Sequence, residues 1–234
     1  MAQETSRRPA TDTPRSAARF VRGSAQAIRA SSARLGQHRA EYLALVRWAQ
    51  VNDRLLTFDF IEQFSFIGEG AEHRVYKREA DKTALKATHP NKFGYSTSDE
   101  GCWASPVEYL KRLAWQNQIF GDDIRLVGVA YEDDQMELVH SQPWINVHDI
   151  RPNPFKEEID EYMGRFGFVT SSLDLDTPLY YSRAHRLVAG DAHDRNVLRD
   201  QNGDLSAIDL VIGRPGPSIL MRIEEFLTGP TLPF

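Results

Sequence analysis

The chain has 234 residues, of which 41% are hydrophobic, and this length and composition are typical of a globular domain with its own core. Its single cysteine, Cys102, excludes an internal disulfide, and no apolar run approaches the ~18 residues that a membrane-spanning helix needs. We therefore expect a protein of a reducing, cytoplasmic compartment without a membrane span.

The net charge of −5 is unevenly distributed along the chain. Residues 1–54 contain ten Arg, no Lys and four acidic residues, whereas the remaining residues contain 18 basic and 29 acidic ones. Residues 1–36 are also rich in Ala, Ser and Thr, which predicts a basic arm that is either disordered or an amphipathic helix. Three roles fit such an arm: a solvated tail, a targeting segment, or a contact for nucleic acid or another anionic surface.

Beyond the arm, apolar spacing predicts helices and short strands in a mixed order. In chain order we expect a helix at 37–51, strands at 63–68, 73–77 and 83–88, a helix at 105–120, a hairpin of 124–131 and 135–140, a helix at 157–164, strands at 168–170, 179–181, 187–189 and 204–209, and a helix at 218–227. Five strands with one inserted helix come first, so the expected fold class is α+β.

Two glycines and a lysine are the first residues that suggest chemistry. Gly68 and Gly70 lie between two expected strands, and glycine lets a backbone approach phosphate oxygens closely. On its own, an ordinary hairpin turn is the simpler explanation. Lys86 follows Gly70 by 16 residues, at the centre of an expected strand. A lysine there is often simply solvated, but this spacing would place its ammonium beneath the glycine turn, where it could pair with phosphate.

Glu108 has two interpretations that the sequence does not separate. The helix that begins near Ser105 places Glu108 where its carboxylate could pair with Lys86. The same glutamate completes the capping box Ser105-Pro106-Val107-Glu108, in which it would only satisfy the start of the helix.

The stretch VAGDAHDRNVLR, residues 188–199, gathers polar residues between two apolar runs, and a surface turn would be enough to explain it alone. However, Asp209 follows Asn196 by 13 residues, at the end of an apolar strand. Two strands joined by a turn at Asn202-Gly203 would bring Asn196 and Asp209 side by side, and their oxygens suit Mg²⁺. Asp191 would then stand one loop away, available to accept a proton. With the glycines and the lysine, these residues supply the parts that phosphoryl transfer needs.

The order of these motifs resembles that of the protein-kinase-like superfamily: a Gly-rich loop, Ala-x-Lys, Asp-x-x-x-x-Asn and Ile-Asp. The loop Gly-Asp-Ala-His-Asp-Arg-Asn looks like the catalytic loop of antibiotic and small-molecule phosphotransferases. More closely, the segments GEGAEHRVY, SPVEYLKRLAWQNQIFGDDIRLVGV, SQPWI and GDAHDRNVL resemble the serine/threonine/tyrosine kinase domain of polyvalent proteins of phages and mobile elements. The resemblance runs from about Leu43 to Leu210 and leaves the basic arm uncovered.

This resemblance implies a reduced two-lobed protein-kinase-like fold in residues 37–234, with a five-stranded N-lobe at about 37–142 and a truncated C-lobe at about 143–234. It implies ATP and Mg²⁺ as cofactors, and a Ser, Thr or Tyr hydroxyl of a protein, this chain included, as the acceptor. By this resemblance, Gly68 and Gly70 would cover ATP, Lys86 would hold its phosphates, and Glu108 would orient Lys86. Gln142 would contact the adenine at a hinge. Asp191 would be the general base, His193 would lie near the transferred phosphate, and Asn196 and Asp209 would bind Mg²⁺.

The chain also departs from the protein-kinase pattern. His73 stands at the third glycine position, Gly190 stands where many kinases carry Arg, and Leu210 follows the metal-binding Asp in place of Phe. Only 25 residues follow Asp209, so we expect no usual activation segment or helical substrate lobe, and an activity that loop phosphorylation does not switch.

Three functions other than a protein kinase fit parts of the sequence. The Gly-Asp-x-His-x-x-Asn loop favours a small-molecule phosphotransferase, but the short C-terminal lobe lacks the helical insertions that build a small-molecule pocket. A nucleotide-binding pseudokinase is disfavoured because all metal and base positions are filled. A metallophosphoesterase could use Asp191 and His193, but the seven histidines are scattered and include no His-x-His pair.

Overall fold

The computed structural model describes residues 14, 15, 17, 18, 34–80, 82–98, 103–171 and 178–228, without the side chains of 34–38. These residues form two compact units. Unit 1 takes its described residues from Met1–Phe93, Ser105–Ala114 and Asp123–Pro143, and unit 2 from Gly94–Ala104, Trp115–Asp122 and Trp144–Phe234. Within this described part of the chain, none of the helices offers an apolar stretch of the length that a bilayer crossing requires.

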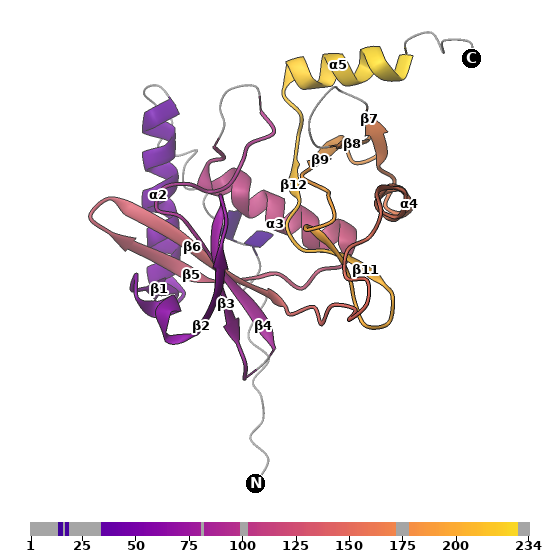
Figure 1. Cartoon of the computed structure of the whole chain (residues 1–234). Coiled ribbons are helices and arrows are strands. Elements are labelled where there is room, and N and C mark those ends of the chain that lie inside the picture. The colour runs from indigo at the N-terminus through magenta and orange to yellow at the C-terminus, as the bar shows by residue number, and fades with distance from the viewer. Residues whose placement is uncertain are drawn as a thin grey trace, which may run out of the picture. The chain divides into compact units, whose positions relative to one another are not determined.

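Unit 1 is built on a six-stranded sheet with the spatial order β1-β5-β6-β4-β3-β2 (Figure 1). Its strands are β1 (Leu55–Leu56), β2 (Ser65–Glu69), β3 (His73–Arg78), β4 (Thr83–Thr88), β5 (Arg125–Glu132) and β6 (Gln135–Pro143). All neighbours are antiparallel except β1 and β5. The hairpin between β5 and β6 turns through Asp133 and Asp134, whose φ angles of 48° and 59° are those that a two-residue type I′ turn requires.

Apolar side chains pack on both faces of this sheet. On one face, helix α2 (Arg34–Val51) and residues 106–114 of helix α3 (Pro106–Phe120) pack on β5 and β6 through a cluster that includes Leu45, Trp48, Tyr109, Leu110, Leu113, Ile124, Leu126, Val129, Met136 and Leu138. The other face carries a smaller cluster of Ile61, Tyr76, Leu85, Ala87 and Val139, next to a short 3-10 helix, η2 (Phe60–Gln63). Because side chains alternate along a strand, Lys86 lies on the face opposite to Leu85 and Ala87.

Unit 2 contains a four-stranded antiparallel sheet and a separate two-stranded ribbon (Figure 1). The sheet has the order β12-β9-β8-β7, from strands β7 (Val169–Ser171), β8 (Leu179–Ser182), β9 (Leu187–Gly190) and β12 (Val211–Gly213). The ribbon pairs β10 (Val197–Arg199) with β11 (Leu205–Ala207). Helices α4 (Lys156–Arg165) and α5 (Pro217–Thr228) complete the unit. Its core includes Ile159, Tyr162, Met163, Phe168, Tyr180, Ala189, Val197, Ala207, Leu210 and Ile212.

The α+β class expected from the sequence is confirmed, and the differences lie in the shortest strands. β1 and β12 lie outside the expected strands, because two or three residues cannot show an apolar period, whereas β10 contains the apolar run Val197–Leu198 that was expected to pair across the Asn202-Gly203 turn. β1 gives the first sheet a sixth strand in place of the expected five. β11 ends at Ala207 and not at Asp209. The basic arm, residues 1–36, lies outside the described residues apart from positions 14, 15, 17, 18 and 34–36, the last three of which begin α2.

β1 lies so close to β5 that no side chain fits at position 128, which is occupied by Gly128. A Cβ atom at this position would lie 2.4 Å from the carbonyl oxygen of Arg54 and 2.6 Å from Cγ of Leu56. Gly128→Ala should therefore force β1 away from β5 and lower the free energy of unfolding by about 1–3 kcal/mol in urea denaturation. The control is Gly164→Ala in α4, where a Cβ atom would meet nothing within 4 Å. Equal losses in the two variants would contradict this explanation.

Candidate functional site

The two glycines lie at the end of the β2–β3 hairpin: Gly68 belongs to β2 and pairs with Val75 of β3, and Gly70 begins the turn. The Gly70 N–H donates to the carbonyl of His73 (2.8 Å), and the Gly70 carbonyl oxygen lies 2.8 Å from Nε2 of His89, so the ordinary hairpin is present. Neither Gly68 nor Gly70 has a positive φ, and a Cβ atom on either would meet no atom within 4 Å. Backbone conformation and packing therefore do not account for glycine at these positions. The bare backbone leaves room for a ligand.

A buried ion pair fixes the end of this turn. Both guanidinium nitrogens of Arg112 contact the Glu72 carboxylate, Nη1 donating to Oε1 at 2.9 Å and Nη2 lying 2.8 Å from Oε2. The exposed fractions of Glu72 and Arg112 are only 8% and 3%. Such a bidentate pair has a defined geometry, which a single lysine contact would not give. The pair therefore holds the glycine turn to helix α3.

A chain of three buried side chains adds a second attachment. The Tyr109 hydroxyl lies 2.6 Å from Nε2 of His73 and 3.2 Å from Nδ1 of His140. A phenol has one proton to donate, so it donates to one imidazole and accepts from the other. Tyr109 lies one helical turn before Arg112, and thus two successive turns of α3 hold the residues that follow Gly70. These partners could not be predicted from the sequence, because an isolated His or Arg within a helix or strand has no distinctive spacing.

Lys86 lies at the centre of β4, between Val75 of β3 and His140 of β6. Its exposed fraction is 6%, so the interpretation of a solvated lysine is wrong. Three strands fix its backbone and the sheet buries its side chain. An ammonium group in such a place is costly unless an anion or hydrogen-bond acceptors surround it. The position of the Lys86 side chain in unit 1 is therefore fixed by its surroundings.

Glu108 forms the capping box that the sequence suggested. Its carboxylate accepts the Ser105 N–H (2.9 Å), and the Ser105 hydroxyl accepts the Glu108 N–H (3.3 Å). The capping interpretation is thereby confirmed. The pairing of Glu108 with Lys86 stays a prediction.

Gln142, the expected adenine contact, belongs to the last part of β6. It pairs with Ala84 of β4, and its exposed fraction is 4%. The next residue, Pro143, ends both β6 and unit 1, and Trp144 begins a segment of unit 2. Gln142 therefore lies at the end of the last segment of unit 1, and its contact with adenine stays a prediction.

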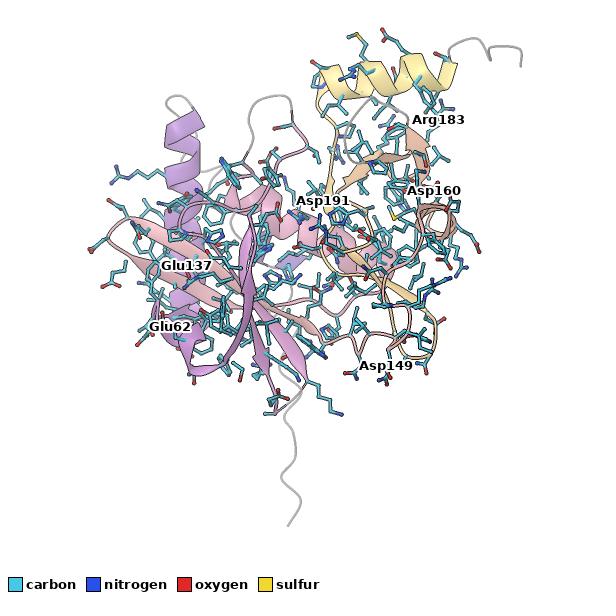
Figure 2. All side chains as sticks on the ribbon, viewed as in Figure 1. Glu62, Glu137, Asp149, Asp160, Arg183 and Asp191 are labelled. Atoms are coloured by element: carbon cyan, nitrogen blue, oxygen red, sulfur yellow. The ribbon has the colours of Figure 1, made fainter. Side chains whose placement is uncertain are left out.

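In unit 2, Asp191 and Asn196 are joined by two hydrogen bonds. The Asn196 side-chain amide donates to the Asp191 carboxylate (Oδ2, 2.7 Å) and to the Asp191 carbonyl oxygen (3.0 Å). The His193 N–H donates to the same carbonyl oxygen at 3.1 Å. Asp191, which Figure 2 labels, follows β9 with a φ of 59°, a left-handed conformation that Asp tolerates better than most residues. The loop thus presents the Asp191 carboxylate in one orientation.

His193 contacts the second oxygen of this carboxylate. Its Nδ1 accepts the N–H of Arg195 (3.1 Å), so in the neutral ring the proton is on Nε2. Nε2 lies 3.3 Å from Oδ1 of Asp191. The second carboxylate oxygen of Asp191 therefore has the His193 ring as a close neighbour.

The ribbon of β10 and β11 brings Asn196 and Asp209 together, as the sequence suggested. Val197 pairs with Ala207, and the Ile208 N–H donates to the carbonyl of Asn196 at 2.8 Å, so Asp209 is one residue beyond this contact. The amide nitrogen of Asn196 faces Asp191, which leaves its amide oxygen as the ligand atom for a metal. An amide oxygen and a carboxylate are the hard donors that Mg²⁺ prefers. These two residues therefore fit a magnesium site.

A buried tyrosine supports the strand that leads to Asp209. The Ala207 N–H donates to the Tyr162 hydroxyl oxygen at 3.2 Å. Burial raises the pKa of Tyr162 to about 12, so the phenol stays neutral throughout the physiological range. The contact is consequently insensitive to pH below that value.

Comparison with known proteins gives one finding. The model of the family described as serine/threonine/tyrosine kinase found in polyvalent proteins matches residues 38–213, which is well over half of the chain. No curated protein shows a significant match.

The buried pair of Glu72 and Arg112 generates a stability prediction. Glu72→Gln and Arg112→Met should each lower the free energy of unfolding by about 3 kcal/mol, because each leaves a buried charge without its counter-ion. The double variant should lose less than the sum, as measured by urea denaturation. Glu79→Gln is the control, because Glu79 pairs with Lys77 in an exposed position and should change stability by less than about 1 kcal/mol. Additive losses in the double variant would show that the pair is not coupled.

Proposed function

Because the chain belongs to the family of serine/threonine/tyrosine kinases found in polyvalent proteins, we propose that it transfers the terminal phosphoryl group of ATP, with Mg²⁺, to a hydroxyl group of a protein. In this proposal unit 1 contributes the N-lobe and the nucleotide contacts. Unit 2 contributes the C-lobe with the base and the metal ligands. The observation that carries the proposal is the loop in which the Asn196 amide donates to one carboxylate oxygen of Asp191 and the His193 ring lies 3.3 Å from the other.

Asp191 is the proposed general base. It accepts the proton of the acceptor hydroxyl as the hydroxyl oxygen bonds to phosphorus and the bond to the leaving ADP breaks. The hydrogen bond from Asn196 fixes its orientation, and a positioned base contributes typically ~10²–10⁴ in rate. ATP with Mg²⁺ supplies the phosphoryl group when bound, and Asn196 and Asp209 are the proposed metal ligands.

The remaining proposed roles belong to unit 1. Gly68 and Gly70 cover the phosphates with bare backbone, which agrees with the open space around both positions. Lys86 is the phosphate contact, and its fixed, buried position supports this role. Glu108 orients Lys86 in addition to capping α3. Gln142 meets the adenine at the end of β6.

A protein acceptor is favoured over a small molecule for a reason independent of the loop. The family description names serine, threonine and tyrosine, which are side-chain hydroxyls of proteins. The basic arm contains Thr11, Thr13, Ser16 and Ser24, and these positions lie outside the described residues. We include the chain itself among the proposed acceptors.

Three substitutions should separate nucleotide binding from transfer. Lys86→Ala and Asp209→Asn should weaken the rise in melting temperature that ATP with Mg²⁺ produces, since a ligand that binds the native state stabilises it. Asp191→Asn should keep that rise and lose transfer by roughly 10²–10⁴. Asp149→Asn, which changes an exposed acid of unit 2 (Figure 2), is the control and should alter neither quantity. A wild type that ATP and Mg²⁺ do not stabilise would refute the proposed function.

The acceptor can be identified by incubating the protein with labelled ATP and Mg²⁺. We expect label on Ser, Thr or Tyr of lysate proteins or of the chain itself, with Asp191→Asn as the blank. Deletion of residues 1–33, which ends before α2, should remove labelling of the chain while nucleotide binding remains. The matched variant replaces Thr11, Thr13, Ser16 and Ser24 by Ala in the full-length chain. Turnover of an aminoglycoside or another small molecule, with no labelled protein, would favour the small-molecule alternative.

A further inference from the structure

The segment between β4 and α3 belongs in part to unit 2. Residues 94–98, which we name the strap, are closed at their base by a hydrogen bond from the Ala104 N–H to the Gly94 carbonyl (2.8 Å). Tyr95 forms an antiparallel bridge with Trp103, and their rings stack with centroids 5.1 Å apart. The strap is thus anchored at Gly94 and Tyr95. Thr97, further along the strap, contacts another segment of unit 2.

Thr97 attaches the strap to the chain that follows β12. Its hydroxyl donates to the carbonyl of Arg214 at 2.9 Å, and its own carbonyl accepts the N–H of Gly216 at 3.0 Å. Both contacts bridge more than a hundred residues of sequence and join the same short connection between β12 and α5. Thr97 therefore holds this connection with its backbone and its side chain together.

Gly213 provides independent evidence for the importance of this contact. A Cβ atom there would lie 2.0 Å from the Thr97 hydroxyl oxygen and 3.1 Å from both Cβ and Cγ2 of Thr97. Gly213 is not among the glycines with positive φ, so its backbone does not require glycine. The approach of Thr97 is what excludes a side chain at position 213. Gly213 and Thr97 are far apart in the sequence, but the Thr97 side chain packs directly against Gly213.

The strand that Thr97 holds leads directly to the proposed active residues. In β12, Val211 pairs with Gly190 and Ile212 with Ala189 of β9. Gly190 immediately precedes Asp191, and Val211 is two residues after Asp209. We propose that Thr97 is a positioning residue: by holding β12 on β9, the strap keeps the metal-binding Asp209 in register with Asp191. This inference rests on the proposed function, because Asp209 has its metal role only there.

The first test is independent of nucleotide. Thr97→Val keeps the shape of the side chain and removes the hydroxyl, so amide hydrogen exchange at residues 211–213 should become about 5-fold faster in the nucleotide-free protein. Thr97→Ser keeps the hydroxyl and should restore slow exchange to within about 2-fold. Ser98→Ala is the matched control, because the Ser98 hydroxyl bonds to Ser96 within the strap (2.8 Å). Unchanged exchange in Thr97→Val would overturn the inference.

The second test measures whether the contact of Thr97 affects Mg²⁺-dependent nucleotide binding. The Mg²⁺ concentration that half-saturates nucleotide binding should rise about 5-fold in Thr97→Val and stay at the wild-type value in Ser98→Ala. Gly213→Ala should also raise this Mg²⁺ concentration. If Gly213→Ala does not fold, Thr97→Val still provides the test. Faster exchange with an unchanged Mg²⁺ requirement would overturn the positioning role. A wild type without Mg²⁺-dependent nucleotide binding would refute the proposed kinase function instead, while Thr97-dependent exchange at β12 would still support the strap.

Discussion

The two hydrogen bonds from the Asn196 amide to Asp191 are the constraint on which the proposed catalytic loop depends. They close the six residues from Asp191 to Asn196 into a compact turn and fix the orientation of both side chains. With its nitrogen committed to Asp191, the amide of Asn196 offers only its oxygen to a metal. One contact therefore orients both the proposed base and a proposed metal ligand, and His193 lies beside the other oxygen of the carboxylate.

The backbone around this loop is held by short strands. β9 leads into Asp191, β10 leaves from Asn196, and β12 begins two residues beyond Asp209. Each pairs with a neighbour over only three residues, so none would be stable alone. Their stability comes from the shared core of unit 2, which includes Ala189, Val197, Ala207 and Leu210. The strap adds to this by covering the connection after β12.

In unit 1, comparable order is achieved through buried polar side chains. Glycine gives the end of the β2–β3 hairpin more backbone freedom than other residues would. The ion pair of Glu72 and Arg112 and the chain of His73, Tyr109 and His140 restrict this freedom on the β3 side, and His89 holds the Gly70 carbonyl. Gly68 and Gly70 carry no side chains, so open backbone lies next to these contacts.

The sequence by itself determined the elements with a clear period, such as β4 and α3, and the local relation of Asp191 to Asn196, because these depend on residues close together in the chain. It also placed Asn196 beside Asp209, since one turn signal sets the register of a short ribbon. Only the tertiary structure decided that Lys86 is buried, that Arg112 pairs with Glu72 and that Thr97 meets Gly213. These contacts join positions about 40 or more residues apart, or depend on what covers a strand, and no spacing within one element encodes them.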